Sequence, residues 1–243
     1  MKILELEYPG TWIKLTNEDE EFEVQNLFIT IDEGFIEANI SLNLFEKANK
    51  QLEPEHRNKE FEYRRQRLEE LEKELRSKDS DDLYYSKLQE EIPQIIKREL
   101  IDKDILPTEV LVRTYLMHAK SFIYSLDCIS SCIRKLENYI KSKSEIINIL
   151  NDLDIYFPNL RDIRNTEHHL EDRVRGIGSN GGKMKVDNII NNNISENKLS
   201  VLTAKGEQKT IEVSYETLEK MQKIIQQAIN VFNWEGPKKY CPM

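Results

Sequence analysis

Arginine and histidine side chains concentrate in one short stretch, residues 158–176. It holds two of the four histidines, His168 and His169, and four arginines, including Arg161 and Arg164. A guanidinium grips phosphate through paired hydrogen bonds, and an imidazole exchanges protons near neutral pH. These two groups in proximity are the minimum set for cutting RNA without a metal ion.

The pattern of this stretch predicts a helix that positions those groups. Pro158 cannot continue a helix from before it, Asn159 and Asp162 read as an N-cap pair, and Gly176 ends the segment. One face is apolar, because four residues recur at helical spacing: Leu160, Ile163, Leu170 and Val174. The remaining surface carries the arginines and histidines.

Residues 164–169 read Arg-Asn-x-x-x-His, and this pattern resembles the signature of the HEPN superfamily of small helical proteins. That signature is an arginine, a polar residue directly after it, and a histidine four to six positions beyond the arginine. The resemblance covers the motif, its helical context from about residue 105 to 175 and, loosely, the final helix. It implies a helical bundle that dimerises with its motif helices face to face, so that two Arg/His sets line one cleft of a metal-independent endoribonuclease.

Carried onto this chain, the resemblance implies roles for three residues. His169 is the expected general base or acid for attack of a 2′-OH on the adjacent phosphate, Arg164 binds that phosphate, and Asn165 orients the pair. The expected product is a 2′,3′-cyclic phosphate. The implied partners are RNA, a second copy of the chain, and an antitoxin or sensor protein, in a toxin or antiphage defence role.

Helix geometry keeps a second set open. At ~100° per residue, Arg164 lies about 140° from His169 around the axis but only about 40° from His168. Arg161 and His168 also satisfy the spacing and share a face, so they are a second pair or a substitute. Glu167 falls in the apolar stripe and is expected to pair with an arginine, to tune a histidine, or to lie at the rim of the dimer seam.

The rest of the chain predicts a mainly all-α fold, a single domain over residues 1–243 built as an antiparallel bundle. Heptad-like apolar spacing predicts one long helix from Asn17 to about Lys50 and a central helix that opens at Pro107. Residues 53–104 form a charged helical arm, in which a salt-bridged surface is favoured over an RNA-binding patch. Residues 176–213 form a loop and a β-hairpin before the last helix, and Lys183 and Lys185 of the loop are weak candidates for substrate contacts. Residues 1–15 read as a short hairpin or as an arm packed on the body.

Composition narrows the function classes. The net charge of −9 argues against a general nucleic-acid binder but not against a nuclease whose positive charge is confined to one cleft. No apolar run approaches the ~20 residues of a membrane span. The first residues do not have the charged and apolar regions of a signal peptide, so a cytoplasmic protein with no membrane partner is expected. The three cysteines, Cys128, Cys132 and Cys241, are expected to be small buried residues rather than metal ligands. No cofactor motif is present, and neither a cofactor nor a metal is expected.

Two functions from different classes therefore follow. The first is the HEPN-type endoribonuclease. The second is a non-catalytic helical dimer that binds a protein or nucleotide partner through its arm and bundle.

Overall fold

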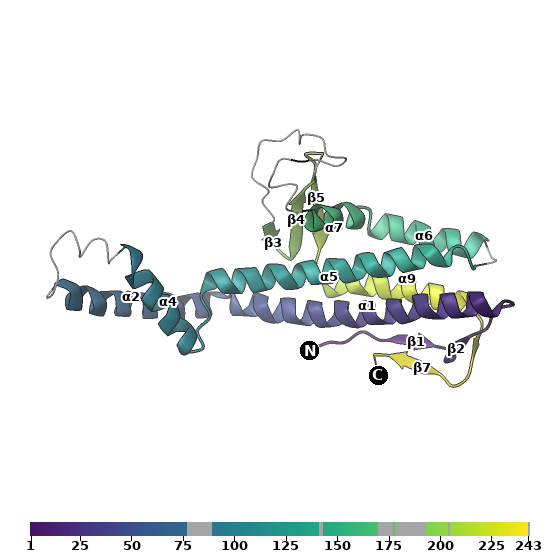
Figure 1. The fold of residues 1–243 in the computed structure, drawn as a ribbon, viewed down its shortest axis with the longest axis horizontal. Coiled ribbons are helices and arrows are strands. Elements are labelled where there is room, and N and C mark those ends of the chain that lie inside the picture. Colours follow the sequence, from purple (N-terminus) through teal and green to yellow (C-terminus); the bar gives the residue numbers. More distant parts are fainter. Residues whose placement is uncertain (77–88, 141–142, 170–176, 178–192, 204, 243) are drawn as a thin grey trace. The chain divides into compact units, whose positions relative to one another are not determined.

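The computed structural model describes residues 1–76, 89–140, 143–169, 177, 193–203 and 205–242 (Figure 1). These residues are mainly α-helical, which confirms the expected fold class. The chain divides into two compact units. Unit 1 comprises residues 1–43 and 118–243, and unit 2 comprises residues 44–117. Helices α1 (Glu18–Gln51) and α5 (Thr108–Leu136) each contribute residues to both units.

The core of unit 1 is formed by the predicted apolar seams of the two long helices. Every seam residue of α1 within this unit is buried: Val24, Phe28, Ile31, Phe35, Ala38 and Leu42. The corresponding buried residues of α5 include Phe122, Ile129 and Leu136. At Gly34 an added Cβ would lie 3.0 Å from Cγ1 of Ile129, so the missing side chain lets the two helices approach closely.

Three further helices complete the described helical part of unit 1: α6 (Lys143–Tyr156), α7 (Leu160–His168) and α9 (Tyr215–Val231). Local capping marks the start of α1 and α9. The Asp19 amide donates to Oδ1 of Asn17 at 3.0 Å, and the Thr217 amide donates to Oγ of Ser214 at 3.2 Å. These side chains satisfy amide groups that the first turn of a helix leaves without an intrahelical partner.

Short antiparallel strands accompany the helices. Strands β3 (Asn193–Ser195), β4 (Lys198–Leu202) and β5 (Gln208–Glu212) form one sheet in which Ser200 is opposite Thr210. Strand β1 (Leu6–Tyr8) pairs with β7 (Lys239–Cys241), and β2 (Trp12–Ile13) pairs with β6 (Trp234–Glu235). The hairpin alternative for residues 1–15 is therefore wrong, because these strands pair with the C-terminal end of the chain rather than with each other.

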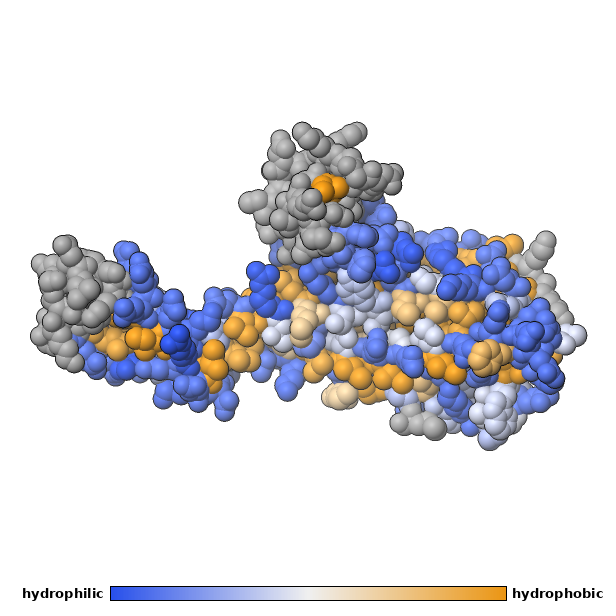
Figure 2. Space-filling view, in the orientation of Figure 1, coloured by the Kyte–Doolittle hydropathy of each residue, from blue (hydrophilic) through white to orange (hydrophobic). Residues whose placement is uncertain are grey.

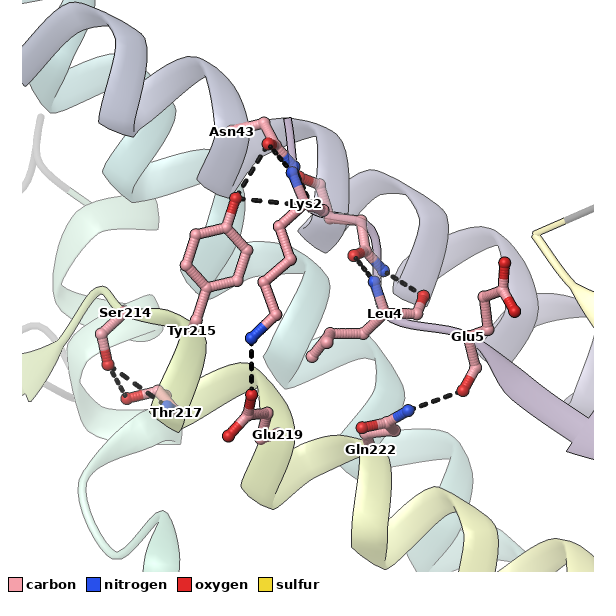
Figure 3. Close-up of polar contacts among 10 residues, drawn as sticks. Lys2, Leu4, Glu5, Asn43, Ser214, Tyr215, Thr217, Glu219 and Gln222 are labelled. Carbon is pink, nitrogen blue, oxygen red and sulfur yellow. Dashed lines mark hydrogen bonds and ion pairs between the residues drawn. The ribbon is translucent and has the colours of Figure 1, made fainter.

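Side-chain amides hold the N-terminal segment on the helices (Figure 3). The Leu4 amide donates to Oδ1 of Asn39 at 2.8 Å, and Nδ2 of Asn39 donates back to the Leu4 carbonyl at 3.2 Å. From α9, Gln226 makes the same two-way contact with the backbone of Glu7. The amide groups thus occupy backbone donors and acceptors that a neighbouring strand would otherwise bind.

Unit 2 contains the end of α1, α2 (Pro54–Arg76), α4 (Ile92–Asp102) and the start of α5. Its α2–α4 pair buries a small cluster: Leu71, Ile92, Ile96 and Leu100. Pro93 lies in the first turn of α4, where its missing amide costs no hydrogen bond.

Ion pairs cover the outside of the α2–α4 pair. Arg67 binds Glu99 through Nε at 2.9 Å, and Arg64 binds Glu60 at 2.7 Å. This confirms the salt-bridged interpretation for Arg64 and Arg67, which are paired within their own chain.

Candidate functional site

Helix α7 carries the predicted site residues and lies in unit 1 beside strands β4 and β5. Asn159 occupies its N-cap as predicted, but the Asn159 side chain makes no capping hydrogen bond. The buried face consists of Leu160, Ile163, Thr166 and Glu167, and the described surface around α7 is hydrophilic in Figure 2. The predicted continuation to Gly176 lies outside the described residues, apart from His169.

A buried carboxylate on α5 joins the two arginines of α7. Asp127 is 4% exposed, and its Oδ2 lies 3.2 Å from Nη1 of Arg161 and 3.2 Å from Nε of Arg164. Arg161 also donates to Oγ of Ser131 at 3.0 Å. One negative charge thus faces two positive ones, which leaves this cluster with a net positive charge in an acidic protein.

The motif residues are linked to one another at the end of the helix. Nη1 of Arg164 donates to Oδ1 of Asn165 at 3.0 Å, and the His169 amide donates to the Asn165 carbonyl at 3.2 Å. The rings of His168 and His169 are exposed and lie 5.0 Å apart in an edge-to-face arrangement. His169 is the C-cap residue, with φ −106° and ψ 38°, so its backbone has already left the helix.

That backbone change limits the angular argument from the sequence. The separation of about 140° between Arg164 and His169 assumes a regular helix through both residues. Because His169 departs from helical geometry, its side-chain direction does not follow from the ideal projection. The sequence distinction between His168 and His169 therefore loses its geometric basis.

Glu167 has a partner that the sequence did not suggest. Its carboxylate is buried and lies 2.5 Å from Nζ of Lys120, on α5. Its ion-pair partner is a lysine, whereas the sequence had left an arginine open as one of three alternatives. Tyr124 lies one turn beyond Lys120, and its pKa is raised by burial and by the negative charge of Glu167, while Arg164 lowers it.

Sequence reasoning thus missed a polar face on α5 formed by Lys120, Tyr124, Asp127 and Ser131. Their spacing of four, three and four residues places them on one side of a helix and was available as a signal. The opposite face of the same helix has the stronger apolar repeat, and it was that repeat that defined the helix as central. The weak candidates Lys183 and Lys185 lie outside the described residues.

Among the described residues, His118 and the three cysteines add no metal site. His118 is partly buried, and this burial lowers its pKa. Cys132 and Cys241 are buried as expected, but Cys128 is exposed, because it points away from the apolar side of α5. Within the described ranges, no three His, Cys, Asp or Glu side chains gather closely enough to hold a metal ion.

No family model, curated protein or solved structure matches this chain. Among the described helices, none combines the length and apolar character that crossing a membrane requires.

Proposed function

We propose that this chain is a metal-independent endoribonuclease of HEPN type that acts in the cytoplasm as a toxin or antiphage effector. In this proposal the helices form an antiparallel bundle with a β-hairpin before the last helix. Two copies of the chain associate with their α7 helices facing each other. The two sets of arginines and histidines then line a single cleft that accepts RNA.

The observation that carries the proposal is the attachment of Arg164 to the buried Asp127, beside Asn165, on a short helix that ends at the exposed His168 and His169. A charge held in place before the substrate arrives stabilises a transition state without a reorganisation cost. Arg164 engages Asp127 through Nε. Its side chain remains 31% exposed, and the guanidinium retains N–H donors for a phosphate.

The proposed reaction gives each of these residues a role. His169 accepts the proton of a ribose 2′-OH, whose oxygen attacks the adjacent phosphorus. The P–O5′ bond breaks, and the departing 5′ oxygen takes a proton from a protonated histidine of the same cleft, which leaves a 2′,3′-cyclic phosphate. Arg164 offsets the charge that develops on the phosphate oxygens, and Asn165 orients Arg164. Arg161 and His168 of the same chain are the second pair or substitute that the sequence left open. The Lys120–Glu167 ion pair links α7 to α5.

The test is RNA cleavage in EDTA by the wild-type chain and by Arg164→Ala and His169→Ala. We expect each substitution to lower the rate by about 10²-fold or more, since one positioned charge or one proton transfer contributes that much. Arg134→Ala is the matched control, because Arg134 is another ion-paired arginine of unit 1 and binds Asp154 instead. An inactive wild type, or two variants as active as wild type, contradicts the proposal.

A second function is favoured by one specific observation. Two pairs of arginines, Arg161 and Arg164 of α7 and Arg64 and Arg67 of the arm, already bind carboxylates of their own chain. An interaction module that binds a protein or nucleotide partner needs no unpaired arginine. For such a module the α7 substitutions leave the cellular phenotype unchanged, whereas deletion of residues 54–78 abolishes partner binding.

A further inference from the structure

A pocket of about 520 Å³ lies between α1 and α5 within unit 1. Such a volume is in the range of small-molecule sites. Three residues of α1 and four of α5 line it: Glu37, Ile40, Ser41, Ser121, Tyr124, Ser125 and Cys128. The close approach of the two helices at Gly34, where the nearest neighbours are Ile129 and the Ser125 backbone, defines one side of this region.

The pocket borders the candidate active site through one shared side chain. Tyr124 lines the pocket and is also close enough to Glu167 and Arg164 for their charges to act on its hydroxyl. A nucleotide whose phosphate is bound at Arg164 therefore has its base within reach of Tyr124. Lys120, one turn before Tyr124 on the same face of α5, is already paired with Glu167.

We propose that this pocket binds a guanine base of the RNA strand, next to the phosphate held by Arg164. The assignment rests on the proposed ribonuclease function and adds a base preference to it. Tyr124 supplies an aromatic ring on which an unstacked base can lie, as is common in recognition of single-stranded RNA. Ile40 is 44% exposed and offers apolar contact from the α1 side.

Glu37 gives the pocket its selectivity. Its Oε2 lies 3.4 Å from Oγ of Ser125, a weak contact that places the carboxylate at the pocket wall. An ionised carboxylate accepts hydrogen bonds and donates none. Guanine alone among the four bases has two neighbouring N–H donors on its Watson–Crick edge, at N1 and N2. Adenine and cytosine place an acceptor nitrogen beside the amino group, and uracil flanks its single N–H with two carbonyls.

The experiment measures binding separately from cleavage. In the full chain carrying His169→Ala, dissociation constants are determined by fluorescence anisotropy for four labelled RNA pentamers, UUXUU, in which X is G, A, C or U. We expect the G pentamer to bind at least tenfold more tightly than the other three. Adding Glu37→Gln reduces this preference to less than threefold, and Tyr124→Ala weakens all four pentamers by about tenfold.

Glu33→Gln is the matched control, since Glu33 is another exposed glutamate of α1 and does not line the pocket. Equal binding of the four pentamers, or an equal effect of Glu33→Gln and Glu37→Gln, overturns the guanine site. Circular dichroism of each variant establishes that the fold is intact. If the wild type cuts no RNA but the G preference and its loss in Glu37→Gln are found, the ribonuclease proposal fails and the guanine site stands.

Discussion

Asp127 is the residue that both arginines of α7 contact. It is buried, carries one charge, and contacts arginines that are 62% and 31% exposed at their side chains. Water therefore screens the arginine side of each pair, which reduces its value for stability. The directional consequence remains, because Asp127 determines where Nε of Arg164 lies. We interpret Asp127 as a positioning residue for the proposed reaction.

Asp127→Asn tests that interpretation. The amide keeps the volume but loses the charge, so Arg164 gains alternative orientations and we expect kcat for RNA cleavage to fall about 10–100-fold. We expect KM to change less than threefold, because both arginines are still present to bind phosphate. Steady-state kinetics on a short RNA separates the two constants.

Ser131→Ala is the control, since it removes the hydrogen bond to Arg161 and leaves the Arg164–Asp127 pair intact. Its kcat should stay within about threefold of wild type. If Asp127 had only a structural role, Asp127→Asn would instead lower the fraction of folded protein. The kcat value per folded molecule would then stay unchanged.

At the scale of elements, the two helices that form the site were predictable to different degrees. The existence of α5 followed from its apolar repeat, and α7 followed from Pro158 and the cap position of Asn159. The pairing of α7 with α5 did not follow, because polar contacts such as Lys120–Glu167 leave no periodic signal in a sequence. From the sequence alone, a charged residue on a helix is expected to face solvent, because its partner on another helix is not known.

Glu60 shows a similar hidden contact in unit 2. This α2 residue is 6% exposed and accepts hydrogen bonds from the Thr108 amide and hydroxyl at the start of α5, at 2.9 and 2.5 Å. Burial acts to raise the pKa of Glu60, but hydrogen bonds from Thr108 and Arg64 outweigh it and lower the pKa below 4.5. The carboxylate also suits the positive end of the helix dipole.

Glu60→Gln is therefore expected to destabilise the protein by about 1–2 kcal/mol at pH 7. The folded pKa lies below the unfolded one, so the contribution is fully present above the unfolded pKa and is lost as pH falls through the folded value. Urea unfolding at pH 7 and pH 3 measures this, and the difference between wild type and variant should shrink at pH 3. Glu55→Gln, at an exposed site of the same helix, should leave the midpoint unchanged. A variant as stable as wild type at pH 7 would contradict the capping role.

For the whole molecule, the sequence predicted a mainly α-helical fold but not the pairing of strands from the two ends of the chain. The seams of α1 and α5 appear where the apolar spacing placed them, because burial of an amphipathic face leaves a strong periodic signal. The pairing of β1 with β7 and of β2 with β6 was not predictable, since strands of two or three residues from opposite ends of the chain carry no register information. The amides of Asn39 and Gln226 that hold the N-terminal segment likewise look like ordinary surface residues in the sequence.

The proposed association of two chains is the last link between this fold and the proposed RNA cleavage, and mixing variants tests it. Arg164→Ala and His169→Ala are each expected to be nearly inactive. If two copies share one cleft, subunit exchange produces mixed dimers in which one chain supplies Arg164 and the other supplies His169. Cleavage should then return to about a tenth of the wild-type rate or more. The recovered rate should rise in proportion to the amount of mixed dimer, which two different affinity tags isolate from the mixture.

If each chain acted alone, every molecule in the mixture would lack one group, and activity would stay at the level of the single variants. Sedimentation of both variants at the dimer mass is the control, because it establishes that the substitutions removed chemistry rather than assembly.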